Sequence, residues 1–275
     1  MAFNPISLNK AQSVIASLSP SLWIDVGTSF RHQTTSGEKA GFLPDYSGNR
    51  NHFKQIASNR KPLIVPNGKN SKAVLRFDGT DDFMQCINQA DNFKFLSSGP
   101  STLFVVHKPW TVADPNALGY LFDNITQGAS IGSRTGFYLR PDDRAAFSFN
   151  DNMVVVVSNN TGGGSVNIVG TTASNGVAPA NTWSINVLRL DPGNVIGANR
   201  LFLSRNGSAE FQGNASTGVI GSGGPTFQMA LGGASGDGLN TYSGDLAAFV
   251  VFPSLLSATN ISAILSSLNS DWNIY

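Results

Sequence analysis

The chain makes a tight polar turn at Arg76-Phe77-Asp78-Gly79-Thr80-Asp81-Asp82-Phe83, where the alternating run of residues 73–77 ends. Glycine reaches backbone conformations that other residues avoid, and short Asp side chains accept hydrogen bonds from neighbouring backbone N–H groups. A second turn of this kind lies upstream, at Asp45-Tyr46-Ser47-Gly48-Asn49-Arg50-Asn51-His52. Because both turns lie beside apolar residues, we expect each of them at the end of a β-strand.

Short runs of strand-forming residues follow one another through most of the chain. Gly, Pro, Asn and Asp separate these runs, and Asn206-Gly207 is a residue pair that favours a two-residue hairpin turn. Short strands at close spacing indicate a sandwich or barrel, whereas alternating helical segments would indicate parallel βα units. We therefore predict strands at residues 22–24, 73–77, 101–108, 137–139, 145–149, 153–157, 183–190 and 201–205.

A short helix is predicted at residues 7–19. Ser7 is a suitable N-cap, and Pro20 cannot continue the helix. The helix could pack on the sandwich as a flank or anchor the chain in a larger assembly, and the sequence leaves both roles open. We therefore divide the chain into a helical, anchoring segment at residues 1–20 and one sandwich domain at residues 21–275. The apolar face of the helix contains Leu8, Ala11, Ile15 and Leu18.

A second helix is predicted near the C-terminus, after the apolar run of residues 249–252. Its apolar residues recur at the 3.6-residue spacing of one helix face, and Asn260 or Thr259 is the expected N-cap. The face contains Ile261, Ile264, Leu265 and Leu268. The centre of the hydrophobic core is expected at Phe77, Phe104, Val106 and Phe249.

The order of these motifs resembles the laminin-G-like domains of the concanavalin A-like lectin and glucanase superfamily. In that family a D-x-S-G-N-x-N-H loop precedes an F-D-G-x-D-D turn, as residues 45–52 and 77–82 do here. Residues 231–233, 242–252 and 271–274 resemble the closing segments of such domains. The resemblance implies an all-β jelly-roll sandwich of two antiparallel sheets with short N- and C-terminal helices. It also implies a fold that carries lectins, glucanases and non-catalytic adhesion modules.

The composition excludes several classes of partner. Charged residues make up 13% of the chain and the net charge is +1, without the Lys and Arg clusters that neutralise nucleic-acid phosphates. No apolar run reaches the ~18 residues of a membrane helix, and no signal-peptide pattern begins the sequence. Cys86 is the single cysteine and is expected to be a small buried residue. We therefore expect neither nucleic acid nor a membrane as partner.

The sequence contains no recognisable catalytic pattern. Glycoside hydrolysis requires two carboxyl groups that flank the scissile bond. The glucanases that the chain resembles carry an E-x-D-x-E motif, whereas its two glutamates, Glu38 and Glu210, lie far apart. The histidines His32, His52 and His107 lack the spacing of a zinc site. We therefore expect a protein that is not an enzyme.

Calcium is the one cofactor that the sequence leaves open. Some relatives in the family that the chain resembles bind calcium at a loop edge, and carboxylate oxygens are ligands that calcium prefers. The candidates are Asp45, Asp81 and Asp82. The alternative is that these side chains cap backbone N–H groups in tight turns, which would also explain Asp78 and Asp245 beside glycines.

A sugar site would combine an exposed aromatic ring with amide or carboxylate side chains. Trp110 and Tyr242 lie in predicted loops and are the first candidates for ligand binding, and Tyr120 follows. The other tryptophans lie in predicted strands and in the C-terminal helical segment and are expected in the core: Trp23, Trp183 and Trp272.

Together these features predict a non-enzymatic structural or binding module. The polar surface, the near absence of cysteine and the missing signal peptide favour a virion surface component, such as a phage capsid decoration, fibre or tail protein. Its partners would then be virion proteins. One alternative is a carbohydrate-binding, lectin-like adhesion domain that binds a glycan and reaches the extracellular space by a non-classical route. A second alternative is a polysaccharide-degrading enzyme with an unrecognised site.

Overall fold

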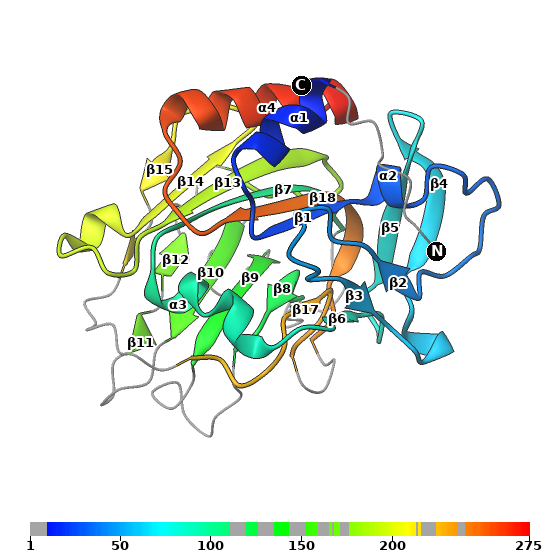
Figure 1. Cartoon of the computed structure of the whole chain (residues 1–275), viewed down its shortest axis with the longest axis horizontal. Coiled ribbons are helices and arrows are strands. Elements are labelled where there is room, and N and C mark those ends of the chain that lie inside the picture. The colour runs from blue at the N-terminus through cyan, green and yellow to red at the C-terminus, as the bar shows by residue number, and fades with distance from the viewer. Residues whose placement is uncertain are drawn as a thin grey trace.

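The computed structural model describes residues 10–110, 119–125, 135–142, 152–158, 165–166, 168–170, 176–212, 214–215, 224–235 and 240–275. Two antiparallel β-sheets pack face to face, and two helices cover the outer face of one of them (Figure 1). The predicted all-β sandwich of jelly-roll type is therefore confirmed. The strand predicted at residues 145–149 lies outside the described residues.

The sheet beneath the helices, sheet A, contains eight strands among the described residues. The C-terminal strand β18 lies in its middle, antiparallel to both β7 and β5, so that the last strand of the chain completes the centre of the sheet. β1 pairs with β18 outside the main order. The order is β15 (Phe211–Gln212), β14 (Leu201–Arg205), β13 (Ser184–Leu190), β7 (Ser101–Pro109), β18 (Ser243–Phe252), β5 (Lys72–Asp78) and β4 (Leu63–Lys69), with β1 at Leu22–Asp25.

The second sheet, sheet B, lies below sheet A in Figure 1 and contains ten strands among the described residues. Its longest pairing joins β9 and β10 over seven register positions. The order is β16 (Asn214–Ala215), β12 (Ile168–Gly170), β10 (Asn152–Ser158), β9 (Gly136–Asp142), β8 (Phe122–Asp123), β17 (Ala230–Leu231), β6 (Met84–Cys86), β3 (Phe53–Lys54) and β2 (Phe42–Leu43), with β11 (Ser165–Val166) beside β10.

Sheet A carries buried apolar residues on both faces, on the outer face where the helices cover it. On β7, Leu103 and Val105 face sheet B, whereas Phe104 and Val106 face the helices, and all four are fully buried. The predicted core residues Phe77 and Phe249 lie between the sheets. All four core predictions are confirmed, and they fall into two apolar layers because β7 is covered from both sides.

The C-terminal helix α4 (Ala258–Trp272) begins one turn earlier than its predicted cap implies. Ser257 is the N-cap, and its hydroxyl accepts a hydrogen bond from the Asn260 N–H. The expectation of Asn260 or Thr259 as the cap is therefore wrong, because both residues lie inside the first turn. Trp272 is buried at the end of the helix, as expected.

The N-terminal helix α1 (Lys10–Ser17) lies beside α4 over sheet A (Figure 1). Ile15 is buried in the layer between the helices and the sheet, and the Gln12 amide donates hydrogen bonds to Asp25 and Thr28. The described part of the helix therefore packs on the sandwich as a flank. Residues 1–9, with Ser7 and Leu8, lie outside the described residues, and the division into residues 1–20 and 21–275 stays a prediction.

The remaining helical turns are short. The α-helical ones are α2 (Val26–Ser29) and α3 (Phe95–Ser98), and the 3₁₀ turns are η1 (Ser58–Arg60), η2 (Ala90–Phe93) and η5 (Gly197–Asn199). Asn206 and Gly207 both have positive φ, of 52° and 74°, which confirms the predicted hairpin turn between β14 and the segment after it. Within the described part of the chain, no helix has the length and hydrophobicity to cross a membrane.

Candidate functional site

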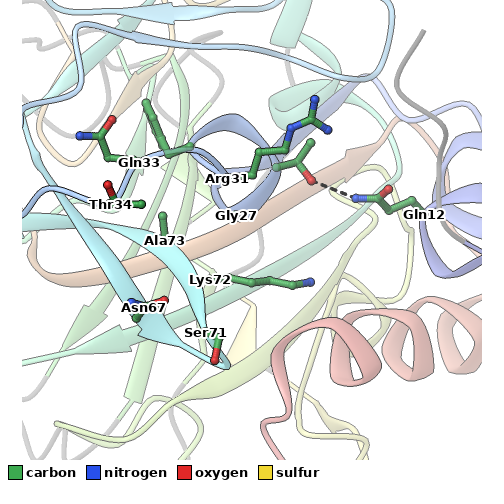
Figure 2. Close-up of a pocket in the computed structure, with 11 residues that line it drawn as sticks. Gln12, Gly27, Arg31, Gln33, Thr34, Asn67, Ser71, Lys72 and Ala73 are labelled. Carbon is green, nitrogen blue, oxygen red and sulfur yellow. Dashed lines mark hydrogen bonds between the residues drawn. The ribbon is translucent and has the colours of Figure 1, made fainter.

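A polar pocket with a volume of about 360 Å³ lies beside α1 at the edge of sheet A (Figure 2). Four segments form its wall: α1, α2 with the loop that follows it, and the two strands of the β4–β5 hairpin. The wall carries amide, hydroxyl and cationic side chains and one aromatic ring, and none of the described residues that line it is an aspartate or glutamate. The side chains that matter most for the argument are Gln12, Thr28, Phe30, Arg31, Gln33 and Asn67.

Asp25 holds one side of this pocket in place. It is the N-cap of α2, and its Oδ1 accepts a hydrogen bond of 3.0 Å from the Thr28 N–H. Its Oδ2 accepts one from the Thr28 hydroxyl at 2.9 Å and one from the Gln12 amide at 3.0 Å. The Gln12 amide also donates to the Thr28 hydroxyl at 3.0 Å, the bond drawn in Figure 2. The two polar side chains are therefore preorganised by one buried carboxylate.

A β-bulge holds the opposite side. The register of β4 against β5 shifts between Val65 and Lys69, and Asn67 inside that interval has a φ of 54°. A Cβ at Gly68 would lie 2.4 Å from a Val74 methyl group, so only glycine fits beside the bulged residue. Bulges redirect side chains relative to a regular strand. Here the bulge brings the Asn67 amide into the wall of the pocket.

Trp110, the first sequence candidate for ligand binding, lies elsewhere, at the end of β7. Its half-buried ring lies under the Arg76 guanidinium, with 4.7 Å between Cζ and the ring centroid. Arg76 in turn binds both carboxylate oxygens of Asp245, at 2.8 and 3.2 Å, and Lys108 lies 3.5 Å from the same carboxylate. The ring therefore belongs to a cluster of charged side chains on the outer face of sheet A. Asp245 does not cap a turn, because it lies within β18.

Two of the tryptophans that were expected in the core, Trp183 and Trp23, also lie on the outer face of sheet A. Trp183 is half-buried under the Lys108 ammonium, 5.9 Å from the ring centroid, and packs at the margin of the outer apolar cluster, so the expected core position holds only in part. Trp23 is buried against the outer face of sheet A, as expected. The outer face holds both kinds of environment because the helices cover only part of it.

Tyr242 and Tyr120 are not exposed loop aromatics. Tyr242 is 1% exposed, between the sheets, and its hydroxyl lies 3.3 Å from His107 Nδ1. His107 Nε2 lies 2.8 Å from the Asn186 side-chain oxygen, and burial lowers the pKa of His107 to about 4. Tyr120 is 5% exposed and packs edge-on against Tyr138. The expectation that these two rings offer a face to a sugar is wrong, because the fold covers them.

Asp45 organises its own loop. Its carboxylate accepts hydrogen bonds from the N–H groups of Trp23, Ser47 and Asn51, each at 2.9 Å, and from the Ser47 hydroxyl at 2.7 Å. His52 Nδ1 accepts a hydrogen bond from the Asp45 N–H. The capping alternative therefore describes Asp45, and its carboxylate oxygens already have four donors.

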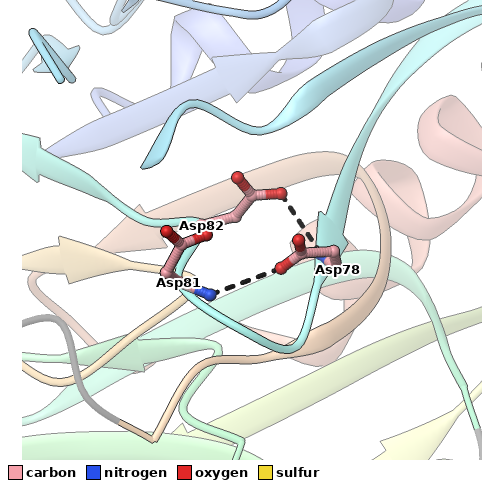
Figure 3. Close-up of side chains that lie close together, drawn as sticks. All are labelled: Asp78, Asp81 and Asp82. Carbon is pink, nitrogen blue, oxygen red and sulfur yellow. Dashed lines mark hydrogen bonds between the residues drawn. The ribbon is translucent and has the colours of Figure 1, made fainter. Parts of the chain in front are cut away.

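The other two calcium candidates, Asp81 and Asp82, lie together with Asp78. One carboxylate oxygen of each lies within 4.8 Å of the others (Figure 3). Asp82 is 4% exposed, its Oδ2 accepts a long hydrogen bond of 3.3 Å from the Asp78 N–H, and its Oδ1 has no partner among the described residues. Burial and then the charge of Asp78 raise the pKa of Asp82 to about 6.

This donor set suits a hard cation, since carboxylate oxygens at such separations can share one ion. Asp78, Asp81 and Asp82 would hold it. The turn itself is well defined, because Gly79 has a φ of 77° and the Asp78 carboxylate accepts a hydrogen bond of 2.8 Å from the Thr80 N–H. Asp78 thus serves as a turn cap, as one alternative expected, and also belongs to the carboxylate cluster.

The residues of the polar pocket were not among the sequence candidates. Gln12, Arg31, Gln33 and Asn67 belong to segments that no short motif connects. The one usable signal was the pair Asn67-Gly68 inside a strand-like run, since a glycine in a strand often marks a bulge.

Comparison with protein-family profiles and with curated protein sequences gives no match. Solved structures do share the architecture. A Trypanosoma rangeli sialidase in complex with sialic acid has a TM-score of 0.55 and 14% identity, over 95% of this chain and 37% of the sialidase. The botulinum neurotoxin serotype D binding domain has a TM-score of 0.51 and 14% identity, over 93% and 53%. The botulinum neurotoxin type G receptor binding domain has a TM-score of 0.52 and 10% identity, over 90% and 51%.

The chain thus spans between about a third and a half of the length of these structures. At such low identity the likeness concerns the fold alone, a β-sandwich of two antiparallel sheets. The expected sandwich architecture is confirmed, and the membership of a particular superfamily stays a prediction.

Proposed function

We propose that this chain is a carbohydrate-binding module and that the polar pocket beside α1 is its site. The observation that carries the proposal is the wall of that pocket, in which amides, hydroxyls and a guanidinium surround about 360 Å³. Such groups donate and accept the hydrogen bonds that sugar hydroxyls need, and pockets for small ligands begin at about 300 Å³. Phe30 adds an aromatic ring to the wall.

A binding role is favoured over hydrolysis by the chemistry of the same wall. Glycoside hydrolysis needs one carboxyl group on each side of the scissile bond, and among the residues that the structure describes no carboxyl group lines the pocket. The names of the structural neighbours support a binding role only in part, since two are binding domains and the third is a sialidase, which is an enzyme. Release of reducing ends from a polysaccharide panel would contradict the non-enzymatic part of the proposal.

A glycan array with matched variants tests the proposed site. Asn67→Gly removes the amide while keeping a residue that accepts positive φ, and Asn181→Gly makes the same change at an exposed residue with a φ of 59° elsewhere. We expect the wild type to bind a subset of glycans. Asn67→Gly should weaken that binding about tenfold or more, the scale of one hydrogen bond to a charged or well-placed partner. Equal binding by Asn67→Gly, or an array without any bound glycan, would overturn the proposal.

Trp110 stays a second candidate contact, because its ring is partly exposed beneath the Arg76 guanidinium. Trp110→Ala on the same array separates the two locations. If that substitution abolishes binding and Asn67→Gly does not, the sugar site is on the outer face of sheet A.

A virion location for the module, with virion proteins as partners, stays a prediction. It rests on composition, and none of the compared structures cited above is named a virion protein. Co-sedimentation of the purified chain with candidate virion particles tests this prediction. A chain that co-sediments with none of them would count against it.

A further inference from the structure

The two cationic side chains of the pocket wall differ in whether a carboxylate neutralises them. Arg31 and Lys72 are the two cationic side chains of its wall, and Figure 2 shows them extending from different elements, the loop after α2 and strand β5. Lys72 is neutralised, because its ammonium lies 2.9 Å from the Asp271 carboxylate and 5.2 Å from the Trp272 ring centroid. Asp25 does not line the cavity, and its two oxygens are engaged by Thr28 and Gln12.

Arg31 is the cationic side chain of the wall that has no carboxylate partner among the described residues. Its side chain is exposed at the pocket, and its Nε donates a hydrogen bond of 3.1 Å to His32 Nε2, a ring nitrogen that accepts only when that imidazole is neutral. In the part of the chain that the structure describes, Arg31 forms no ion pair with a carboxylate. Its two terminal NH₂ groups present the planar fork that binds a carboxylate through two parallel hydrogen bonds.

The neutral polar side chains of the wall complement this cation. Gln33 and Asn67 extend from the loop after α2 and from the β-bulge, and neither carries charge. A ligand with one carboxylate and several hydroxyl groups would therefore match the pocket in both respects. A neutral sugar would leave the Arg31 fork paired with water. A ligand with many charges would meet only one cationic side chain that has no carboxylate ion pair among the described residues.

From this arrangement we infer that the pocket binds an anionic saccharide and that the Arg31 guanidinium holds the sugar carboxylate. The inference rests on the proposed function and names its ligand class. Binding forms no covalent bond. A sulfated sugar carries the same charge on a tetrahedral group, whose terminal oxygens an arginine fork can also bind, so the sulfated analogue has to be tested separately.

The test uses the full chain and paired oligosaccharides that differ in one group. Each pair contains an oligosaccharide ending in galacturonic or glucuronic acid and the methyl ester of the same molecule, and a terminally sulfated analogue forms a third arm. The variants are Arg31→Gln, which removes the charge, Arg31→Lys, which keeps the charge without the fork, and Lys54→Gln as an exposed charge control on β3. Melting temperatures establish that all four proteins are folded.

We expect at least one acid to bind about tenfold or more tightly than its methyl ester, and Arg31→Gln to remove that ratio. Arg31→Lys should restore only part of it, and Lys54→Gln should leave it unchanged. Acids and esters that bind equally, acids that fail while neutral glycans bind, or a ratio that survives in Arg31→Gln would each overturn the inference and leave the proposed function standing. A preference for the sulfated analogue would overturn the carboxylate assignment. A chain that binds no glycan of any class overturns the proposed function together with this inference.

Discussion

Two buried ionisable side chains mark this sandwich at the scale of single residues. His107 lies between the sheets beside Tyr242 and Asn186, and burial holds its pKa at about 4. Asp82 lies in the turn after β5, and burial raises its pKa to about 6. In both cases the protein interior disfavours the charged form of the side chain. The two shifts affect the free energy of unfolding with opposite signs as the pH falls.

His107 predicts a loss of stability in mild acid. Its folded pKa of about 4 lies below the ordinary value of 6.5, so between these values the unfolded chain binds a proton that the folded chain does not. This contribution is complete above pH 6.5 and is lost as the pH falls to 4, by about 3 kcal/mol at most. Denaturant unfolding of the wild type and His107→Gln at several pH values measures it.

The comparison with His107→Gln matters because Asp82 acts over an overlapping range. A carboxyl group whose pKa is raised in the folded state makes the folded protein more stable as the pH falls through that pKa. This gain is common to the wild type and His107→Gln. The difference in unfolding free energy between the two proteins should therefore shrink toward acid. Parallel pH profiles would show that His107 protonates as easily in the folded state as in the unfolded state.

The carboxylates of Asp78, Asp81 and Asp82 predict a response to calcium. A cation that binds only the folded chain raises its stability, by about 2.7 kcal/mol at a hundredfold excess over the dissociation constant. We expect a higher melting temperature in calcium than in EDTA, and no such difference for Asp82→Asn. Asp91→Asn, at an exposed aspartate on η2, is the control that should keep the response. An identical melting temperature for the wild type in calcium and EDTA would contradict the prediction.

At the scale of elements, the two helices that cover sheet A are held differently. α4 buries Ile264, Leu268 and Trp272 against the sheet and carries an N-cap of its own. The described part of α1 has eight residues, and its Gln12 amide ties it to the N-cap of α2. Isolated helices of this length are marginal in water, so both depend on the packing beneath them. Because α1 supplies part of the pocket wall, its packing also shapes the candidate site.

The N-cap of α4 predicts a measurable cost of substitution. Ser257→Ala removes the acceptor for the Asn260 N–H and should lower the free energy of unfolding by about 1 kcal/mol. Thr259→Ala, inside the exposed first turn, is the matched control and should change it by less than about 0.5 kcal/mol. Urea unfolding followed by far-UV circular dichroism measures both. A larger cost for Thr259→Ala would show that the helix begins at the position expected from sequence.

At the scale of the whole molecule, this is a three-layer structure in which sheet A lies between sheet B and the helices (Figure 1). Two buried apolar clusters meet at sheet A, one on each face. Phe122 of sheet B stacks on Phe249 of sheet A in the inner layer, and Phe104 packs edge-on against Phe252 in the outer one. Sheet A therefore contributes side chains to both apolar layers.

The burial of Phe104 allows a prediction of how much the outer apolar layer contributes to the free energy of unfolding. Its side chain is fully buried beneath the helices, and Phe104→Ala should lower the free energy of unfolding by about 3–5 kcal/mol. Phe42→Ala is the control, because Phe42 lies on an edge strand and is 47% exposed. Its cost should stay well below that of Phe104→Ala, at about 1 kcal/mol. Comparable costs for the two substitutions, measured by denaturant unfolding, would contradict the layered arrangement.

Much of the fold could be predicted because its signals are local. The turn at Asp78-Gly79, the hairpin at Asn206-Gly207 and the strand at residues 201–205 each depend on the conformational preferences of adjacent residues. The site could not be predicted in the same way. Tyr242 sits beside a glycine-containing turn signal, but the pairing of β18 with β5 and β7 turns its ring between the sheets.

By itself, then, the sequence predicted several of the longer strands, the main turns, the two helices and the all-β sandwich, since hydrophobic spacing and turn residues act over a few positions of the chain. Only the tertiary structure decided which polar side chains meet. Gln12, Arg31 and Asn67 come from separate segments that lie together because α1 packs on the sheet and a bulge redirects β4. Tertiary contacts also buried Tyr242 and left Arg31 without an acidic partner among the described residues, because burial and charge pairing depend on distant parts of the chain.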